Sequence, residues 1–269
     1  MDKRPIGIFD SGIGGLTVAK EIFNRLPCEN VIYFGDTARV PYGTKSPQTV
    51  RKFSFSNMRF LMSQKVKMVI VACNTASATS IGKLRDEFSH IPIIGVIEPA
   101  VELALICTGN KKIGVIGTEG TIASNTYLKE IKMLSPDVLL FGQPCPLFVP
   151  LVEEGWINRK ETLMVAREYL SPLKKKKIDV LILGCTHYPL LKNVIKKVMG
   201  RGVAIIDSAR VVAEECEEVL REKGLLNKKG RKGWHKFFTS DNPERFKKIG
   251  QRFLGYKIGN VTQIDIEKY

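Results

Sequence analysis

The 269-residue sequence has no apolar run close to the roughly 18 to 20 residues that a membrane-spanning helix requires. The opening, MDKRPIGIFDSG, reaches Asp10 within a few residues, without the longer apolar core and small-residue cleavage site of a signal peptide. Hydrophobic residues make up 44% of the chain and aromatic residues 8%, which is ordinary for a globular protein. We therefore expect a cytoplasmic protein with no membrane segment, long enough for two modest domains.

Histidine is scarce, and no two cysteines are spaced as CxxC. Neither the three histidines nor the six cysteines show the ligand spacing of a zinc site, so the sequence predicts no metal centre. In a large chain with no export signal, reduced thiols are favoured over disulfides. A dithiol redox protein is disfavoured as well, because redox pairs usually lie close together in sequence.

Acidic residues are also in deficit, since 42 Lys and Arg stand against 27 Asp and Glu, for a formal net charge of +15. Basic residues concentrate in LKKKKID (173–179) and NKKGRKGWHK (227–236). Such clusters are typical of surfaces that contact nucleic-acid phosphates, or of a solvated lysine-rich surface. We favour the second interpretation because no nucleic-acid motif accompanies the charge, although the charge leaves the first open. The field would also attract a small anionic substrate.

Short, continuous apolar runs bounded by turn residues recur along the chain, as expected for strands of a parallel sheet that is covered on both faces. Helical patterns separate them; one is predicted to start at Pro47 with Ser46 as its cap. This alternation predicts an α/β fold with doubly wound, mainly parallel sheets. The expected strands are 5–10, 30–36, 67–73, 91–97, 111–117, 137–142, 179–185 and 203–207.

The two halves of the chain resemble each other. VIVACNT and LILGCTH place Cys73 and Cys185 directly after apolar strands, 112 residues apart, and IGIFDSG near the start is echoed by IGVIGTEGT (113–121). Ligands of doubly wound sheets bind beyond the carboxyl ends of the strands. We therefore expect two pseudo-symmetric lobes that face each other, with both thiols at an active site in the cleft between them.

Two facing thiols indicate a particular chemistry. A free thiol has a pKa of about 8.5 and is mostly protonated at neutral pH unless its site lowers that pKa. Asp10 and His187 are candidates to assist proton movement at Cys73 and Cys185. One cysteine beside a histidine would suggest a nucleophile. Two cysteines from symmetric halves suggest a base on one face of a carbon and an acid on the other, which inverts that carbon. This arrangement requires no metal or electron-sink cofactor, and the sequence signals none.

The loops around the thiols suit a small polar acid. We expect Ser11 and its neighbouring glycines to start a helix whose N–H groups can take a carboxylate. The loop is not a dinucleotide fingerprint, because Thr17 stands where GxGxxG requires glycine. Further candidate binding residues are Tyr42, Gly43, Asn74, Thr75 and Thr186, with Thr118 and Thr121 from the second half as a weaker set.

FDSGIGG, GDTARVPYG, ACNTASA, GVIEPA and LGCTHYPLL closely resemble the signatures of glutamate racemases, within the aspartate/glutamate racemase superfamily. The resemblance implies cofactor-independent interconversion of L- and D-glutamate, which supplies D-glutamate for bacterial peptidoglycan. It also implies a homodimer whose protomer has one lobe at 1–98 and 207–269 and another at 99–206. The implied catalytic residues are Cys73, Cys185, Asp10, His187 and Glu153, the last with Glu154 as an alternative register; the implied substrate-binding residues are Asp10, Ser11, Tyr42, Gly43, Asn74, Thr75, Thr186 and His187.

Three alternatives stay open on sequence alone. An aspartate racemase usually has Thr-Glu after the second cysteine, where this chain has Thr186-His187, so glutamate is favoured. A decarboxylase of the same superfamily would need only one of the two cysteines. A nucleic-acid or partner-binding protein that keeps a racemase fold would use the +15 charge.

Overall fold

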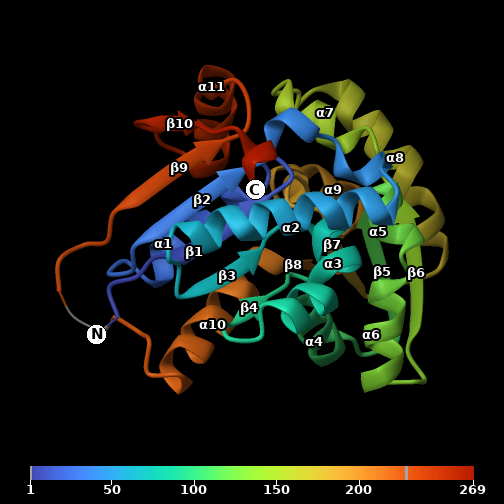
Figure 1. Cartoon of the computed structure of the whole chain (residues 1–269). Coiled ribbons are helices and arrows are strands. Elements are labelled where there is room, and N and C mark those ends of the chain that lie inside the picture. The colour runs from blue at the N-terminus through green and yellow to red at the C-terminus, as the bar shows by residue number, and fades with distance from the viewer. Residues whose placement is uncertain (1, 228–229) are drawn as a thin grey trace.

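The computed structural model describes residues 2–227 and 230–269, which form two parallel β-sheets covered by helices (Figure 1). Every strand pairing in these residues is parallel. The first sheet has the order β10 (Val261–Gln263), β9 (His235–Thr239), β2 (Val31–Gly35), β1 (Ile6–Asp10), β3 (Met68–Val71), β4 (Ile93–Ile94). The second has the order β6 (Leu139–Pro144), β5 (Lys112–Gly117), β7 (Val180–Gly184), β8 (Ala204–Asp207). The predicted α/β class is confirmed.

The four strands of the second sheet repeat the connectivity of four strands in the first. In each set the first strand along the chain lies between the second and the third, and the fourth strand lies beside the third. The two orders are β2-β1-β3-β4 and β6-β5-β7-β8. β1 pairs with β3 through Phe9 and Val71, and β5 pairs with β7 through Ile116 and Leu183. The internal echo therefore reflects a real pseudo-symmetry. Cys73 and Cys185 follow equivalent strands of the two sheets.

The central strands of the first sheet, β1, β2 and β3, are mostly apolar and buried at every position. Ile6 and Ile8 of β1 point into one core, while Phe9 points into the other. The first core lies under α1 (Leu16–Arg25) and α10 (Ser208–Glu222), and the second under α2 (Pro47–Ser63) and α3 (Asn74–Glu87). α2 begins at Pro47 and is capped by the Ser46 hydroxyl, as predicted.

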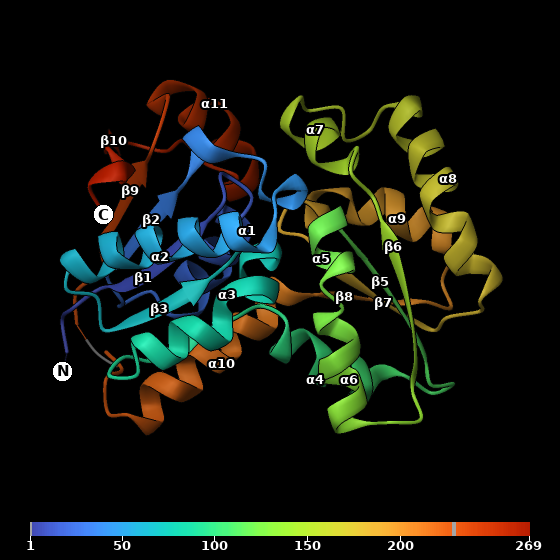
Figure 2. The ribbon, with the colours of Figure 1, turned by 45° about the vertical axis from the view of Figure 1, so that its right-hand side comes forward.

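The second sheet lies apart from the first in Figure 2, and most of the remaining helices belong to its side of the molecule. α4 (Glu98–Cys107) packs against α10 and also against β7 and β8, and so links the two sheets. None of the helices in the described ranges combines the length and the apolar character needed to cross a membrane. The others are α5 (Glu119–Ala123), α6 (Thr126–Leu134), α7 (Phe148–Glu153), α8 (Lys160–Lys175), α9 (Lys192–Met199) and, over the first sheet, α11 (Pro243–Leu254).

All eight predicted strands are present, but the first sheet also contains β9 and β10, which the sequence did not indicate. β9 begins within the basic cluster at His235 and Lys236, and β10 has only three residues, two of them exposed. β9 pairs with β2, so the C-terminal segment extends the first sheet. The lobe boundaries at 98/99 and 206/207 stay a prediction.

Candidate active site

A cavity of about 410 Å³ lies where the carboxyl ends of both sheets face each other. It is lined by Cys73 and Cys185 and by most of the other predicted site residues: Ser11, Tyr42, Gly43, Asn74, Thr75, Thr118, Glu153, Thr186 and His187. Asp10 and Thr121 lie fully buried just behind this lining. Val40, Pro41, Pro146, Val149 and Pro150 supply an apolar wall that the sequence analysis did not anticipate.

Cys73 follows β3 and forms the cap of α3, and Asp10 is the last residue of the adjacent strand β1. Burial and the nearby Asp10 carboxylate raise the pKa of the Cys73 thiol to about 12, against smaller opposing contacts with Ser11 and the Ala76 amide. Burial likewise raises the pKa of Asp10, whose carboxylate accepts hydrogen bonds from the Gly12 amide at 2.9 Å and the Thr186 hydroxyl at 3.5 Å. Cys73 is therefore a protonated thiol at neutral pH.

Cys185 has a different partner. Its Sγ lies 3.9 Å from Nδ1 of His187, and the other ring nitrogen, Nε2, lies 3.1 Å from Oε1 of Glu153 at the end of α7. Burial works to lower the pKa of His187, but the contacts with Cys185 and Glu153 outweigh it and raise that pKa to about 10. Burial works to raise the pKa of Glu153, and contacts with His187 and Arg245 outweigh it and lower that pKa. Cys185 thus sits beside an imidazolium ion.

The C-terminal helix α11 supports this second half from across the cleft. Nη1 of Arg252 donates a 2.6 Å hydrogen bond to the backbone carbonyl of Glu153, and Arg245 lies 3.6 Å from the Glu153 carboxylate. The ring of Phe253 meets the His187 imidazole edge-on, with centroids 5.4 Å apart. The sequence did not predict these residues, because a helical pattern does not indicate which distant loop the helix contacts.

The glycine loop before α1 approaches the second cysteine motif closely. A Cβ atom at Gly14 would lie 2.3 Å from Oγ1 of Thr186 and 2.5 Å from Nδ1 of His187, so only glycine fits there. The expectation that Ser11 starts the helix is wrong. α1 begins at Leu16 with Gly15 as its cap, because Ser11 and the glycines are used to bring the loop against the other lobe.

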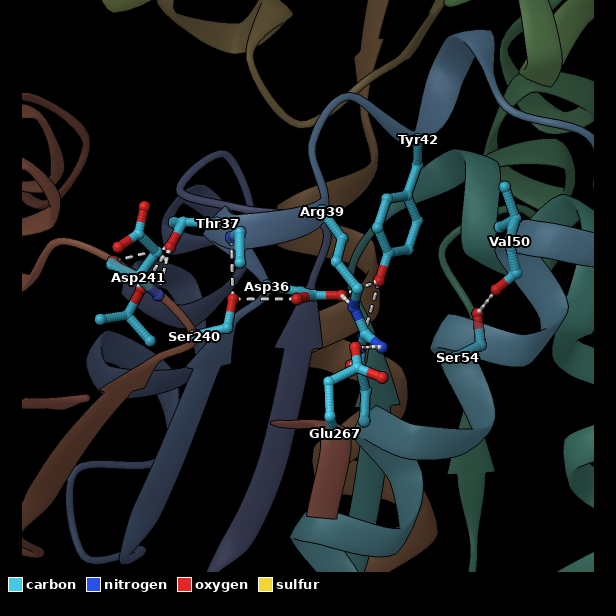
Figure 3. A network of polar contacts seen from close by, with 12 residues as sticks. Asp36, Thr37, Arg39, Tyr42, Val50, Ser54, Ser240, Asp241 and Glu267 are labelled. Carbon is cyan, nitrogen blue, oxygen red and sulfur yellow. Dashed lines mark hydrogen bonds and ion pairs between the residues drawn. The ribbon is translucent and has the colours of Figure 1, made fainter. Parts of the chain in front are cut away.

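The side chain of Tyr42 is committed to a buried network beneath the cavity (Figure 3). Its hydroxyl donates a hydrogen bond to Asp36, which also accepts from Nε of Arg39 at 2.7 Å and from Oγ of Ser240 at 2.9 Å. Asn57 donates to the Tyr42 oxygen at 3.1 Å. The phenol hydroxyl is therefore engaged within the protein, which leaves the backbone of Tyr42 and Gly43 to contact a ligand. Asp36 is the last residue of the strand expected at 30–36 and is not among the predicted site residues.

A polar cluster joins the two halves at the other side of the cavity. Oγ1 of Thr75 lies 2.9 Å from that of Thr118 and 3.1 Å from that of Thr121, and the Thr118 hydroxyl caps α5. Oδ1 of Asn74 accepts a 2.7 Å hydrogen bond from the hydroxyl of Tyr127 on α6. Tyr127 was not predicted, because it lies inside a helix and belongs to no motif. In residues 2–227 and 230–269, no three His, Cys, Asp or Glu side chains converge as metal ligands would.

Comparison with known proteins fits this geometry. Residues 16–216 match the profile of the Asp/Glu/Hydantoin racemase family, which is most of the chain. The chain belongs to this family. The curated glutamate racemase of Geobacter metallireducens is 51% identical over 267 residues, covering 99% of this chain and 98% of that protein.

Solved structures of family members superpose over nearly the whole chain. Glutamate racemase from Francisella tularensis, solved in complex with D-glutamate, matches with a TM-score of 0.94 at 40% identity and covers all of both chains. The Escherichia coli enzyme, solved with L-glutamate and the activator UDP-MurNAc-ala, matches with a TM-score of 0.79 at 26% identity, covering 97% of this chain and 98% of that one. The cavity of this chain is thus built on a scaffold that holds glutamate in its relatives.

Proposed function

We propose that this protein is a glutamate racemase that interconverts L- and D-glutamate by two-base proton transfer at the α-carbon. The observation that carries the proposal is the placement of Cys73 and Cys185 after equivalent strands of two sheets, on one cavity. The relatives support the substrate, since one is solved with D-glutamate and another with L-glutamate.

The reaction needs one thiolate and one thiol. The thiolate sulfur of one cysteine takes the α-proton, and the electron pair of the broken C–H bond moves into the adjacent carboxylate. The thiol of the other cysteine then gives its proton to the opposite face of the α-carbon, so the product is the mirror image of the substrate. Hydrogen-bond donors that line the cavity stabilise the intermediate anion. The two cysteines have exchanged protonation states at the end of this step, and the reverse reaction starts from there.

Each thiol has its own assistant in this proposal. Burial and then the Asp10 carboxylate keep Cys73 protonated at rest. The same carboxylate stabilises the proton that Cys73 takes up during the reaction. The His187 imidazolium lies beside Cys185, and Glu153 holds His187 in that charged form and orientation. General acid–base catalysis of this kind depends on groups held within hydrogen-bond reach.

Glutamate is bound by hydroxyl and amide groups, since no lysine or arginine lines the cavity within the described ranges. Nδ2 of Asn74 is buried and has no hydrogen-bond partner among the described residues, so a carboxylate oxygen would satisfy it. We propose that the other binding groups are Asp10 and Ser11, the Tyr42-Gly43 backbone, Thr75, Thr186 and His187.

The proposal extends to cellular role and assembly. A cytoplasmic glutamate racemase would supply D-glutamate for peptidoglycan. We also propose a homodimer, supported by large apolar side chains exposed on α4 and α6, which lie side by side in Figures 1 and 2: Ile106, Met133 and Leu134. Light scattering coupled to size exclusion would report a mass of twice the 30.1 kDa chain; a monomer at all concentrations would contradict this part.

The decisive experiment follows the circular dichroism of L-glutamate, and separately of D-glutamate, with purified protein in D2O and no added cofactor. We expect both enantiomers to lose optical activity, with solvent deuterium at the α-carbon of the product by mass spectrometry. Cys73→Ala and Cys185→Ala should each abolish racemisation. If folded, reduced wild-type protein leaves glutamate unchanged, the same assay with aspartate tests the sister activity. Failure with both, together with salt-dependent DNA binding, would replace the racemase proposal with a role for the basic surface.

A further inference from the structure

Of the two polar atoms of the Asn74 side-chain amide, only the oxygen has a hydrogen-bond partner among the described residues. Asn74 follows Cys73 at the start of α3, lines the cavity and is 3% exposed. Its oxygen accepts the hydroxyl proton of Tyr127 at 2.7 Å, while no acceptor for Nδ2 lies within reach in the described part of the chain. A buried, unpaired NH2 group is costly, so its direction is a functional feature and not a packing accident.

Tyr127 determines that direction. The residue lies on α6 of the second lobe, is 2% exposed, and reaches across to α3 of the first lobe. Burial first, and then the charge of Cys185, raises the pKa of its phenol, which therefore keeps its proton at any working pH. A phenol has one proton to donate, and the acceptor that the structure gives it is Oδ1 of Asn74. With the oxygen held by Tyr127, the amide has one orientation, in which NH2 is left for a ligand.

We propose that Tyr127 is a positioning residue that orients the Asn74 amide so that its NH2 group meets a carboxylate of the substrate. This inference rests on the proposed racemase function, because it assigns the ligand of that same cavity. Since the two residues come from different lobes, the binding group is complete only when α6 of the second lobe lies against α3 of the first. Tyr127 does not touch the reacting atoms and acts through Asn74.

The test compares two substitutions on the same helix. Tyr127→Phe removes one hydroxyl. Thr126→Val, the matched control, removes a neighbouring inter-lobe hydrogen bond, from Oγ1 of Thr126 to the Ala78 carbonyl at 2.9 Å, without contacting Asn74. Binding is measured by calorimetry with an equilibrated mixture of L- and D-glutamate, which gives no net heat of turnover. We expect Tyr127→Phe to raise the Kd and KM about tenfold, a change of about 1.4 kcal/mol, with a smaller change in kcat. Thr126→Val should change them less than about twofold.

Two further variants decide the mechanism. In an Asn74→Ala background, Tyr127→Phe should have no additional effect on Kd, because the two residues act through one contact. Asn74→Asp keeps the acceptor for Tyr127 but replaces the NH2 group by an oxygen that repels a carboxylate. It should weaken binding more than Asn74→Ala does, and it tests the orientation even if Tyr127→Phe does not fold.

The outcomes separate this inference from the proposed function. If wild-type protein neither binds nor racemises glutamate, the proposed function fails. If it does both, equal effects of Tyr127→Phe and Thr126→Val would overturn the positioning role and leave the racemase intact. An undiminished effect of Tyr127→Phe in the Asn74→Ala background would also overturn it, as would Asn74→Asp that binds as well as wild type.

Discussion

Replacing Glu153 by glutamine should lower the pKa of His187. The carboxylate of Glu153 lies 3.1 Å from Nε2 of His187 and, with Cys185, raises the imidazole pKa to about 10, although burial opposes the rise. Glutamine keeps the size and one hydrogen bond of the side chain but removes the charge. The contribution of the Cys185 contact to the raised pKa remains. His187 should therefore stay above its ordinary pKa in the variant, but by less than in wild type.

The size of the shift follows from the geometry. An opposite charge within about 4 to 6 Å shifts a pKa by about 1 to 3 units. Because the Glu153 side chain is 25% exposed, solvent screens it, and we expect a fall of about 1 to 2 units. A raised histidine pKa stabilises the folded state fully below the unfolded value near 6.5 and ceases to do so as the pH rises through the folded value. The variant should thus lose about 1.4 to 3 kcal/mol of unfolding free energy at pH 6, and less at alkaline pH.

The measurement is nuclear magnetic resonance of protein carrying 15N-labelled histidine. With three histidines in the chain, His187 is assigned by its loss in a His187→Gln variant. His235 serves as an internal reference, because burial and then Lys232 lower its pKa to about 4. Glu154→Gln is the matched control, since it removes the same charge one residue away and the structure shows no contact between Glu154 and His187. An unchanged His187 pKa in Glu153→Gln, or equal shifts in both variants, would refute the reasoning.

Three further predictions concern the support of the site and the fold. Gly14→Ala places a Cβ 2.3 Å from Oγ1 of Thr186, so the loop must move, and steady-state kinetics should show kcat/KM lower by about 100-fold while the melting temperature changes little. Arg252→Met removes the hydrogen bond to the Glu153 carbonyl, and the same resonance titration should show a lower pKa for His187. Lys67→Met leaves the buried Glu29 carboxylate without its ion-pair partner at 2.6 Å, and urea unfolding should show a loss of about 3 to 5 kcal/mol.

The sheets were predictable because each expected strand is a short apolar run, and the central strands β1, β2, β3, β5 and β7 are buried at nearly every position, as a parallel sheet covered on both faces requires. β9 escaped prediction since its sequence, HKFFT, begins inside a basic cluster and its burial depends on pairing with β2. β10 is too short to carry a pattern. Local sequence therefore indicates a strand only where the strand carries an apolar run of its own.

The placement of the two cysteines and their neighbours on one cavity was predictable for a related reason. Cys73, Cys185 and their neighbours follow directly after strands, and a parallel sheet brings strand ends to one edge. Tyr127 and Arg252 lie on helices, and what they contact depends on how two lobes pack together. The sequence predicted a helix start at Ser11, whereas the structure has a loop there. The close approach of Gly14 to Thr186 is not visible in the sequence.

The two halves of the site share a topology but differ in chemistry, and thermodynamics limits where that difference can be observed. Cys73 sits beside a carboxylate and Cys185 beside an imidazolium, so the two directions of the proposed reaction start from unlike bases. L- and D-glutamate have equal free energies in solution, however, so kcat/KM must be equal in both directions for any variant. The asymmetry can appear only in kcat and KM taken separately. Asp10→Asn, which removes the charge beside Cys73, should therefore lower kcat/KM equally for both enantiomers and still change their two kcat values by different factors.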